Sequence, residues 1–264
     1  MISFPNFKIN IGLFITKKRD DGFHDLETIF YPVDCQTDKL EILKIDSSFK
    51  LTVVNASFLK DPESNLCTKA YRLLEKDYHL PEIEIILTKN IPIGAGLGGG
   101  SADAAFTLKM VNELFALNIP VEKLKQYASK LGSDVAFFIE NKPAYASGKG
   151  EILETIPLDL ADKIITIVKP HFSVSTADAY KWVTPQPASF SLKNILSIPV
   201  GEWKYYLKND FEKNLFVKYP PLEEIKNSLY HAGALYASLS GSGSALYAIS
   251  DYPLKLNIKN CDVL

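Results

Sequence analysis

The segment "NIPIGAGLGGGSADAAFTLKMVNELFAL", residues 90 to 117, joins a glycine-rich loop to a regular apolar stripe. Five of the chain's fourteen glycines fall in the seven positions from 94 to 100. The apolar residues that follow are spaced by four, three and four, which predicts one face of a helix: Ala104, Leu108, Val111 and Phe115. Glycine is favoured where backbone turns sharply or another group approaches closely. This loop therefore predicts a mixed α and β chain with a ligand close to its backbone.

Two familiar glycine loops fit this segment poorly. A Walker A loop needs a lysine before its Ser or Thr, and here Ser101 follows Gly100 directly. A dinucleotide fingerprint is satisfied only formally, by Gly94, Gly96 and Gly99. Pro92 interrupts the preceding strand, and no clear second strand ends in an acidic residue ~20 positions later.

A third kind of loop fits better. In "PIGAGLGGGSA", Pro92 to Ala102, glycines let consecutive amides turn toward one anion. We expect the helix to begin near Ser101, where unpaired N–H groups and the positive end of the helix dipole add to the site. Such a loop can hold a triphosphate without a lysine. A flexible linker is disfavoured, because it would have no reason to lead straight into an amphipathic helix.

The rest of the chain also mixes strands and helices. Alternation over Ile9–Ile15 predicts a half-buried strand with Lys8 and Asn10 together on its polar face. Asp21-Gly22 is a turn signal, and Ser64 is a candidate cap for a helix within residues 63–78. Further strands are expected at 26–34, 39–45, 49–55, 82–91 and 163–170, and a further helix at 121–132. Residues 220–250 are expected to form a helix, a strand, a glycine-serine loop and a second strand, and a domain boundary is expected near 150.

Composition limits the classes of partner. The 29 basic and 31 acidic residues leave a net charge of −2, so neither nucleic acid nor a membrane surface is indicated as a partner. No apolar run approaches ~18 residues, and the N-terminus lacks the pattern of a signal peptide. Cysteines 35, 67 and 261 have no paired spacing, which is typical of reduced thiols in the cytoplasm, where we expect this chain. The four histidines include no HxxxH pair, so a histidine metal site is not expected.

Five motifs in order resemble the GHMP kinase superfamily. Besides the glycine loop, they are "KINIGLFITKKRDDGFHDLETIF", "LGSDVAFFI" at 131 to 139, "SGKGE" at 147 to 151 and "SLSGSGSALYAI" at 238 to 249. The opening "KINIGL…KRDDGFH" and the triple glycine of "GLGGGSA" resemble, within the superfamily, the kinases that act on 4-diphosphocytidyl-2-C-methyl-D-erythritol. The resemblance covers most of the chain.

The resemblance implies a fold and a reaction. The fold would be α+β with two domains: an ATP-binding domain over 1–150 similar to ribosomal protein S5 domain 2, and a ferredoxin-like substrate domain over 151–264. The reaction would be ATP-dependent phosphorylation of the substrate's 2-hydroxyl in the non-mevalonate (methylerythritol phosphate) isoprenoid route. ATP would be the co-substrate and Mg²⁺ a cofactor whose protein ligands the sequence does not identify. The partner would be this small molecule, and the chain a monomer or weak homodimer.

Two residues are implied as catalytic. Asp134 in "LGSD" would take the proton of the acceptor hydroxyl, and Lys8 would keep Asp134 ionised and stabilise developing negative charge. Without the resemblance, Asp134 would be interpreted as a helix N-cap and Lys8 as a solvated strand residue.

The motif "DGFH" carries the cytidine assignment. His24 would hydrogen-bond the cytosine edge while an aromatic ring stacks on its face. The family commonly has Tyr where Phe23 stands, and that change keeps stacking but loses a hydroxyl contact. Tyr180 is the candidate for a second ring. Thr176 and Asn10 are the other expected substrate contacts, although "HFSVSTADAY" departs from the family pattern.

The resemblance also implies the ATP contacts. Asn65 would lie near the adenine, and Ser101 would contact a phosphate or Mg²⁺. Ala102 replaces a Ser often found at that position. The Ser240–Ser244 loop would brace the ATP loop or the substrate diphosphate, or would simply be a tight strand connection. The expected loop contacts are Pro92, Ile93, Gly94, Ala95, Gly96, Leu97, Gly98, Gly99, Gly100, Ser101 and Ala102.

Three other functions stay open at this point. A GHMP kinase with another acceptor is disfavoured by "KRDDGFH", and a catalytically inactive sensor on the same fold is disfavoured because Lys8 and Asp134 are both present. A dinucleotide-dependent oxidoreductase is the least favoured. ADP release measured with a panel of acceptors would separate these functions.

Overall fold

The computed structural model describes residues 1–56 and 61–264. These residues form two compact units that alternate along the chain. Unit 1 contains Met1–Phe7, Gln36–Ile93 and Gly98–Lys142, and unit 2 contains Lys8–Cys35, Gly94–Leu97 and Pro143–Leu264. The expected domain boundary near 150 stays a prediction.

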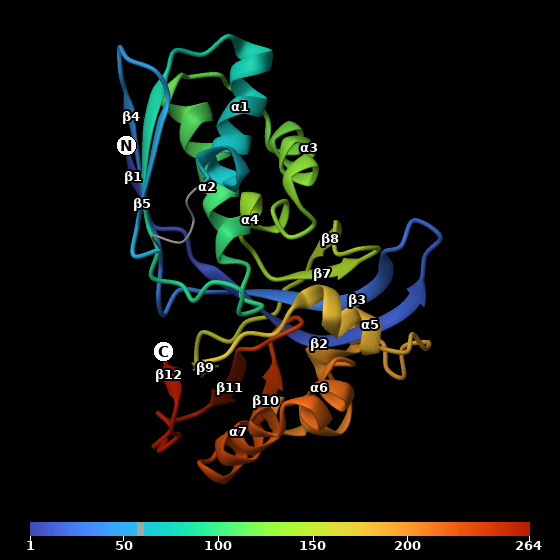
Figure 1. Cartoon of the computed structure of the whole chain (residues 1–264). Coiled ribbons are helices and arrows are strands. Elements are labelled where there is room, and N and C mark those ends of the chain that lie inside the picture. Colours follow the sequence, from blue (N-terminus) through green and yellow to red (C-terminus); the bar gives the residue numbers. More distant parts are fainter. Residues whose placement is uncertain (57–60) are drawn as a thin grey trace. The chain divides into compact units, whose positions relative to one another are not determined.

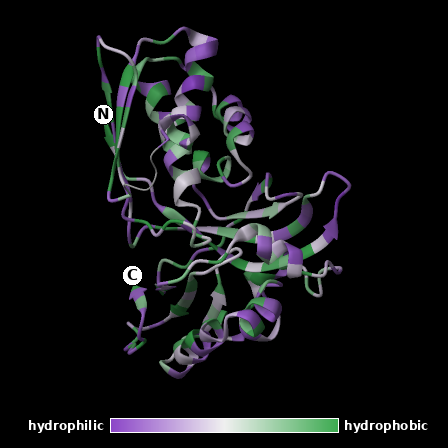
Figure 2. Cartoon of the chain, in the orientation of Figure 1, coloured by the Kyte–Doolittle hydropathy of each residue, from purple (hydrophilic) through white to green (hydrophobic). Residues whose placement is uncertain are grey.

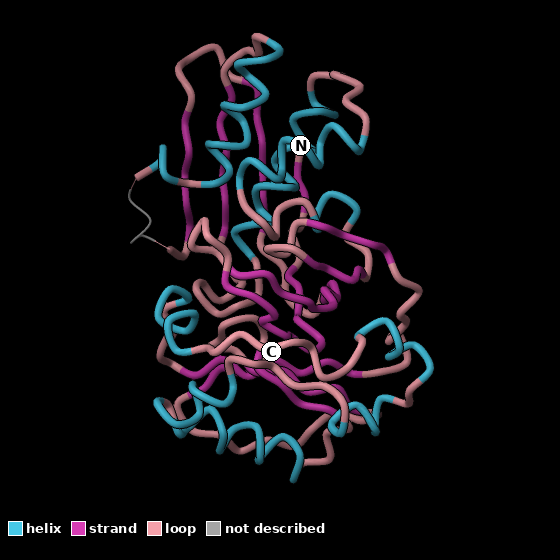
Figure 3. Tube along the Cα trace, turned by 90° about the vertical axis from the view of Figure 1, so that its right-hand side faces the viewer, coloured by secondary structure: helices cyan, strands magenta, loops and turns pink. Residues whose placement is uncertain are grey.

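Unit 1 contains one four-stranded sheet. Its helices lie beside this sheet, as Figures 1 and 3 show. The strand order is β1-β4-β6-β5, antiparallel except for the parallel β5–β6 pair. The strands are β1 (Ile2–Ser3), β4 (Lys39–Lys44), β5 (Lys50–Val54) and β6 (Ile83–Thr88). The helices are η1 (Pro62–Ser64), α1 (Leu66–Tyr78), α2 (Gly99–Leu114), α3 (Val121–Leu131) and α4 (Phe137–Glu140).

Local sequence signals explain the helices of unit 1. Helices α1 and α3 each combine hydrophilic and hydrophobic residues, as Figure 2 shows. The buried residues include Leu74 in α1 and Leu124 in α3. The expected Ser64 cap is wrong by one residue, because Asn65 Oδ1 accepts the N–H of Cys67 at 2.9 Å. Ser64 instead ends the short η1 helix.

Unit 2 contains two four-stranded sheets. One has the order β2-β3-β7-β8 and the other β10-β11-β9-β12. The strands are β2 (Phe7–Lys18), β3 (His24–Val33), β7 (Ala144–Ser147), β8 (Ile152–Thr155), β9 (Ile164–Pro170), β10 (Tyr236–Leu239), β11 (Leu246–Ser250) and β12 (Cys261–Val263). The helices are α5 (Thr176–Trp182), η2 (Leu192–Ser197), η3 (Val200–Tyr205), α6 (Glu212–Lys218) and α7 (Pro220–His231).

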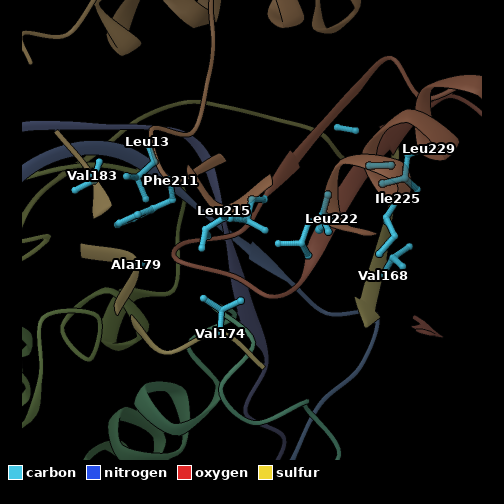
Figure 4. Close-up of a cluster of buried hydrophobic side chains, with 14 of the residues drawn as sticks. Leu13, Val168, Val174, Ala179, Val183, Phe211, Leu215, Leu222, Ile225 and Leu229 are labelled. Atoms are coloured by element: carbon cyan, nitrogen blue, oxygen red, sulfur yellow. The ribbon is translucent and has the colours of Figure 1, made fainter. Parts of the chain in front are cut away.

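One hydrophobic core joins both sheets of unit 2 to its helices (Figure 4). Leu13 of β2 and Val168 of β9 belong to the same cluster of buried residues as Ala179 of α5, Leu215 of α6 and Leu229 of α7. Fully burying one such aliphatic side chain contributes about 1.5–3 kcal/mol. This core therefore connects β2 to chain that lies more than 150 residues later.

Strand β2 departs from the expected half-buried pattern. Every residue from Phe7 to Ile15 is buried, including Lys8 and Asn10, which are each 3% exposed. The polar side chains are covered by distant chain: Lys8 Nζ donates to the Gly96 carbonyl at 3.1 Å, and a Cβ on Gly241 would lie 3.4 Å from Asn10 Oδ1. Alternation in the sequence identified the two faces, but the second layer comes from distant chain.

The described residues agree with the expected α+β class. Among them, no helix is both long enough and apolar enough to cross a membrane.

Candidate active site

The glycine loop leads directly into α2. Gly94, Gly96 and Gly98 have φ values of +66°, +80° and +73°, which L side chains rarely adopt. Gly98 is the N-cap residue of α2. Because glycine has no side chain, this position makes no side-chain capping hydrogen bond to the first amides of the helix. The helix begins at Gly99, two residues before the expected Ser101. The first-turn amides are therefore supplied partly by glycines, and no side-chain cap from Gly98 competes with an anion for them.

Different glycines in this loop have different neighbours. A Cβ on Gly96 would lie 2.0 Å from the Ser240 carbonyl oxygen, so the group that approaches this position is the chain's own backbone. At Gly94 and Gly100 a Cβ would meet none of the described atoms within 4 Å. The open positions that a ligand can approach are thus Gly94 and Gly100, whereas Gly96 is needed for packing.

Lys8 is held next to this loop within unit 2. Its Nζ donates to Asn10 Oδ1 at 2.5 Å and to the Gly96 carbonyl at 3.1 Å, and it lies 5.0 Å from the centre of the Phe30 ring. Asn10 in turn donates from Nδ2 to Thr28 Oγ1 at 3.1 Å. The expected common face of Lys8 and Asn10 is confirmed, and it brings the ammonium to the backbone of the loop.

The Ser240–Ser244 loop braces this part of the glycine loop. Ser240 Oγ donates to the Gly96 carbonyl at 3.0 Å, and the Ala245 N–H donates to the Ala95 carbonyl at 3.0 Å. Asn209 stabilises the Ser240–Ser244 loop, since its Nδ2 donates to the carbonyls of Leu239 and Gly241. Asn209 was missed from the sequence, where a single Asn between Lys208 and Asp210 carries no signal.

His24 and Tyr180 come together from distant segments. Their rings stack with centroids 5.0 Å apart and an interplanar angle of 27°. Tyr180 also meets Phe211 edge-on at 4.9 Å. Burial, followed by the charge of Lys18, lowers the pKa of His24 below its usual 6.5. The imidazole is therefore neutral at pH 7, with one nitrogen able to donate and the other able to accept.

The other expected substrate residues lie separately in unit 2. Phe23 does not join the ring pair; it is 57% exposed and lies under Lys149, whose Nζ is 4.7 Å from the ring centre. Thr176 begins α5, and its Oγ1 is 2.9 Å from Ser242 Oγ. Thr176 is thus linked to the loop that braces Gly96. Lys149 lies in the "SGKGE" motif and Ser242 in "SLSGSGSALYAI", but the sequence alone does not indicate that they contact Phe23 and Thr176.

The remaining expected residues belong to unit 1. Asp134 lies in the turn between α3 and α4 and is partly buried. Asn65 uses Oδ1 to cap α1, which leaves its Nδ2 group to donate. Ser101 is partly buried and Ala102 fully buried in the first turns of α2. Pro92 and Ile93 lead into the loop. The catalytic and binding roles of all these residues remain predictions.

The sequence also did not predict a buried ion cluster in unit 1. Lys89 directly follows β6 and pairs with Asp38 and Asp103 in unit 1. Buried lysines and aspartates are rare unless paired. The sequence offered one weak signal, namely an acidic residue inside the otherwise small and apolar run "SADAA".

Models of known families match two stretches of the chain. Residues 65–142 match the GHMP kinases N terminal domain, and residues 192–258 match the GHMP kinases C terminal domain. The first stretch contains the helix after the glycine loop as well as Asp134, and the second contains the Ser240–Ser244 loop.

Solved structures of several small-molecule kinases are similar to this chain. A crystal structure of 4-(cytidine 5'-diphospho)-2C-methyl-D-erythritol kinase is similar with a TM-score of 0.80 and 30% identity, over 96% of this chain and 91% of that one. Homoserine kinase from Cytophaga hutchinsonii has a TM-score of 0.70 at 20% identity, over 98% of each chain, which shows the fold alone. The expected α+β GHMP kinase fold is confirmed.

Sequence relatives are closer still. A protein from Bacteroides fragilis named 4-diphosphocytidyl-2-C-methyl-D-erythritol kinase is 51% identical over 252 residues, which cover 94% of this chain and 92% of the relative. One of the same name from Parabacteroides distasonis is 47% identical over 96% of this chain and 93% of its own length. Identity at this level over nearly the whole length shows that the chain belongs to the 4-diphosphocytidyl-2-C-methyl-D-erythritol kinase family of GHMP kinases.

Proposed function

We propose that this chain transfers the γ-phosphoryl group of ATP to the 2-hydroxyl of 4-diphosphocytidyl-2-C-methyl-D-erythritol, in the methylerythritol phosphate route to isoprenoid precursors. The observation that carries the proposal is the stacked pair of His24 and Tyr180, 5.0 Å apart, in a chain of this family. A neutral imidazole edge beside an aromatic face suits a cytosine ring.

The proposed catalytic pair is Asp134 and Lys8. Phosphoryl transfer depends mainly on positioning and on stabilised charge. Asp134 accepts the hydroxyl proton as the oxygen attacks phosphorus, and Lys8 stabilises the negative charge that develops. Support for Lys8 comes from its buried ammonium on the Gly96 carbonyl, which fixes it at the glycine loop.

The proposed ATP site is the glycine loop with the first turn of α2. Open space at Gly94 and Gly100 and the uncapped amides of the helix support it. Asn65 is proposed near the adenine. Phe23, Thr176 and Asn10 are proposed on the cytidyl substrate. We also retain 1–150 and 151–264 as the proposed ATP-binding and substrate domains.

Mg²⁺ is proposed as a partner of the ATP phosphates, whose charge it offsets. Among the described residues, no group of three His, Cys, Asp or Glu side chains could hold a metal ion. Mg²⁺ is commonly bound by one or two carboxylates together with substrate phosphates, so the protein ligands of the proposed ion stay unassigned. A cytoplasmic location, where ATP is abundant, and a monomer or weak homodimer complete the proposal.

The test is ADP release by the purified chain with a panel of acceptors. We expect turnover with the cytidyl substrate, and little with its uridyl analogue, mevalonate or homoserine. Phosphorus NMR of the product should place the new phosphate on the 2-hydroxyl. Turnover with mevalonate or homoserine instead would replace the proposed acceptor and leave only a GHMP kinase.

A further inference from the structure

One lysine and two aspartates form a buried cluster in unit 1. Asp38 lies just before β4 and Lys89 just after β6, which are paired so that Lys39 faces Thr88. Asp103 lies in the second turn of α2. Lys89 Nζ donates to Asp38 Oδ2 and, at 2.6 Å, to Asp103 Oδ2, and the three side chains are 5%, 0% and 3% exposed.

The cluster holds the chain on both sides of the glycine run. Asp38 Oδ1 accepts the N–H groups of Asn90 at 2.6 Å and Ile91 at 2.8 Å, so this carboxylate fixes the approach to the loop. On the far side, a Cβ on Gly99 would lie 3.5 Å from Lys89 Nζ and 3.0 Å from Ile91 Cγ2. The ammonium therefore lies against the first turn of α2 and is also bonded to Asp103 in the second.

Stability alone is a poor explanation for this arrangement. Replacing a buried ion cluster by well-packed apolar residues is often neutral or stabilising. Asp103 Oδ1 is also buried with no hydrogen-bond partner among the described residues, which is unfavourable in itself. An arrangement that costs stability at the base of a binding loop has the character of a positioning device.

We propose that Lys89, bonded to Asp38 and Asp103, is a positioning residue that fixes the segment entering the glycine loop against the start of α2 and thereby sets ATP affinity. Lys89 would act through the loop backbone, not by touching ATP. The inference rests on the proposed use of this loop for ATP. It predicts that the cluster affects nucleotide binding more than binding of the cytidyl substrate.

The test compares two lysines of unit 1 in the full chain, the buried Lys89 and the partly buried Lys109. Lys89→Met removes the link between the loop and α2. Lys109→Met is the matched control, because Lys109 lies further along α2, where its Nζ donates to the Phe138 carbonyl at 3.1 Å and lies 3.7 Å from the centre of the Phe106 ring. Calorimetric titration with a non-hydrolysable ATP analogue and Mg²⁺, and separately with the cytidyl substrate, gives both affinities. Thermal melting measures stability.

We expect Lys89→Met to raise the nucleotide Kd by about tenfold or more, since small displacements of positioned groups have effects of up to about 10². In the same variant, the Kd of the cytidyl substrate should change by less than about twofold. Lys109→Met should leave the nucleotide Kd unchanged. A folded Lys89→Met chain with wild-type nucleotide affinity would overturn the proposal.

A second variant separates positioning from burial of charge. Lys89→Met with Asp103→Asn removes the ammonium together with the carboxyl group that it pairs with, and Asp38 keeps its two amide donors. We expect this double variant to regain melting temperature while its nucleotide Kd stays high; recovery of both would overturn the proposal. Asp103→Asn alone, which is isosteric, should raise the nucleotide Kd by a smaller factor, and an unchanged Kd there would count against the link.

Failure of the inference differs from failure of the proposed function. A wild-type chain that binds the ATP analogue but does not phosphorylate the cytidyl substrate contradicts the proposed acceptor and leaves the lysine comparison valid. A wild-type chain that binds no nucleotide contradicts the inference as well.

Discussion

At the scale of residues, burial gives Lys8 its character. A strand lysine ordinarily extends its ammonium into water. Here the side chain is 3% exposed, and the Asn10 amide oxygen and the Gly96 carbonyl accept from its Nζ. A buried charge needs such partners because water no longer solvates it. The same contacts limit where the ammonium can point, which is what a group that stabilises developing charge requires.

Asp134→Asn should cut turnover and leave nucleotide binding nearly intact. The amide is almost isosteric but cannot accept the hydroxyl proton, and general-base catalysis contributes about 10²–10⁴-fold. Steady-state kcat and calorimetric nucleotide Kd measure the two effects. A fall in kcat of less than about tenfold would argue against Asp134 as the base.

His24→Ala should raise KM for the cytidyl substrate by about tenfold or more, because a polar group left unpaired on the buried cytosine edge costs about 1–3 kcal/mol. KM for ATP should stay nearly constant. The control is His231→Ala, which removes an exposed histidine at the end of α7. The pKa of His24 lies below its usual 6.5. The wild-type KM for the cytidyl substrate should therefore rise only in acid, where the imidazole becomes charged. Equal efficiency with cytidyl and uridyl substrates would contradict this role.

At the scale of elements, the junction of loop and α2 combines two different uses of glycine. Gly96 makes room for the Ser240 carbonyl, and its φ of +80° also disfavours a side chain. Gly100 lies in the first turn of α2, with open space where its Cβ would be. One position therefore serves packing within unit 2, and the other leaves the helix N-terminus accessible.

This contrast predicts opposite outcomes for two alanine substitutions. Gly96→Ala should lower the melting temperature, because its Cβ would overlap backbone that cannot move aside easily. Gly100→Ala should keep or raise it, since alanine favours a helix over glycine by about 0.5–1 kcal/mol. Gly100→Ala should still raise KM for ATP by about tenfold, or ~1.4 kcal/mol, by crowding the phosphates. Thermal melting and ATP kinetics on both variants provide the check; an unchanged KM for ATP in Gly100→Ala would remove Gly100 from the ATP site.

At the scale of the whole molecule, the Asp38–Lys89–Asp103 cluster links folding to pH. Burial is the main cause that raises the pKa of Asp103 to about 7; the Asp38 charge adds to it and Lys89 opposes it. Burial also raises the pKa of the facing Cys67 thiol far above its usual range, so that thiol stays neutral. Asp103 therefore holds a proton in the folded chain at pH values where an unfolded aspartate, with a pKa of ~3.9, has lost it.

The sign of the pH dependence follows from this difference. A folded pKa above the unfolded one contributes stability that is complete below pH ~4 and is lost as pH rises to about 7. The free energy of unfolding of the wild type, relative to Asp103→Asn, should fall by at most about 1.4 kcal/mol per pH unit in that window. Above about pH 8 the difference should be constant. Urea unfolding of both chains at pH 5, 6, 7 and 8 tests it, and a pH-independent difference would contradict the raised pKa.

The sequence by itself determined the features whose signals are local. Apolar periodicity predicted the helices at 66–78, 99–114 and 121–131 to within two residues, and turn chemistry predicted the bend at Asp21-Gly22. The glycine loop, with the other four motifs, was enough to predict the α+β kinase fold and the family. Element ends were less certain, because Asn65 caps α1 where Ser64 was expected, and a left-handed Gly98 starts α2 early. Side chains and backbone within one or two turns of each other decide such features.

Only the tertiary structure decided which distant groups meet. The Ser240 carbonyl beside Gly96, the Tyr180 ring on His24, and Lys89 between Asp38 and Asp103 join positions that lie 14 to 156 residues apart. Such contacts depend on strand order and register and on how helices pack over a sheet, and no local periodicity encodes them. For the same reason the second buried face of β2 was not expected. Its apolar alternation identifies one core, whereas its polar face is buried by loops from elsewhere in the chain, whose packing sets the site's geometry.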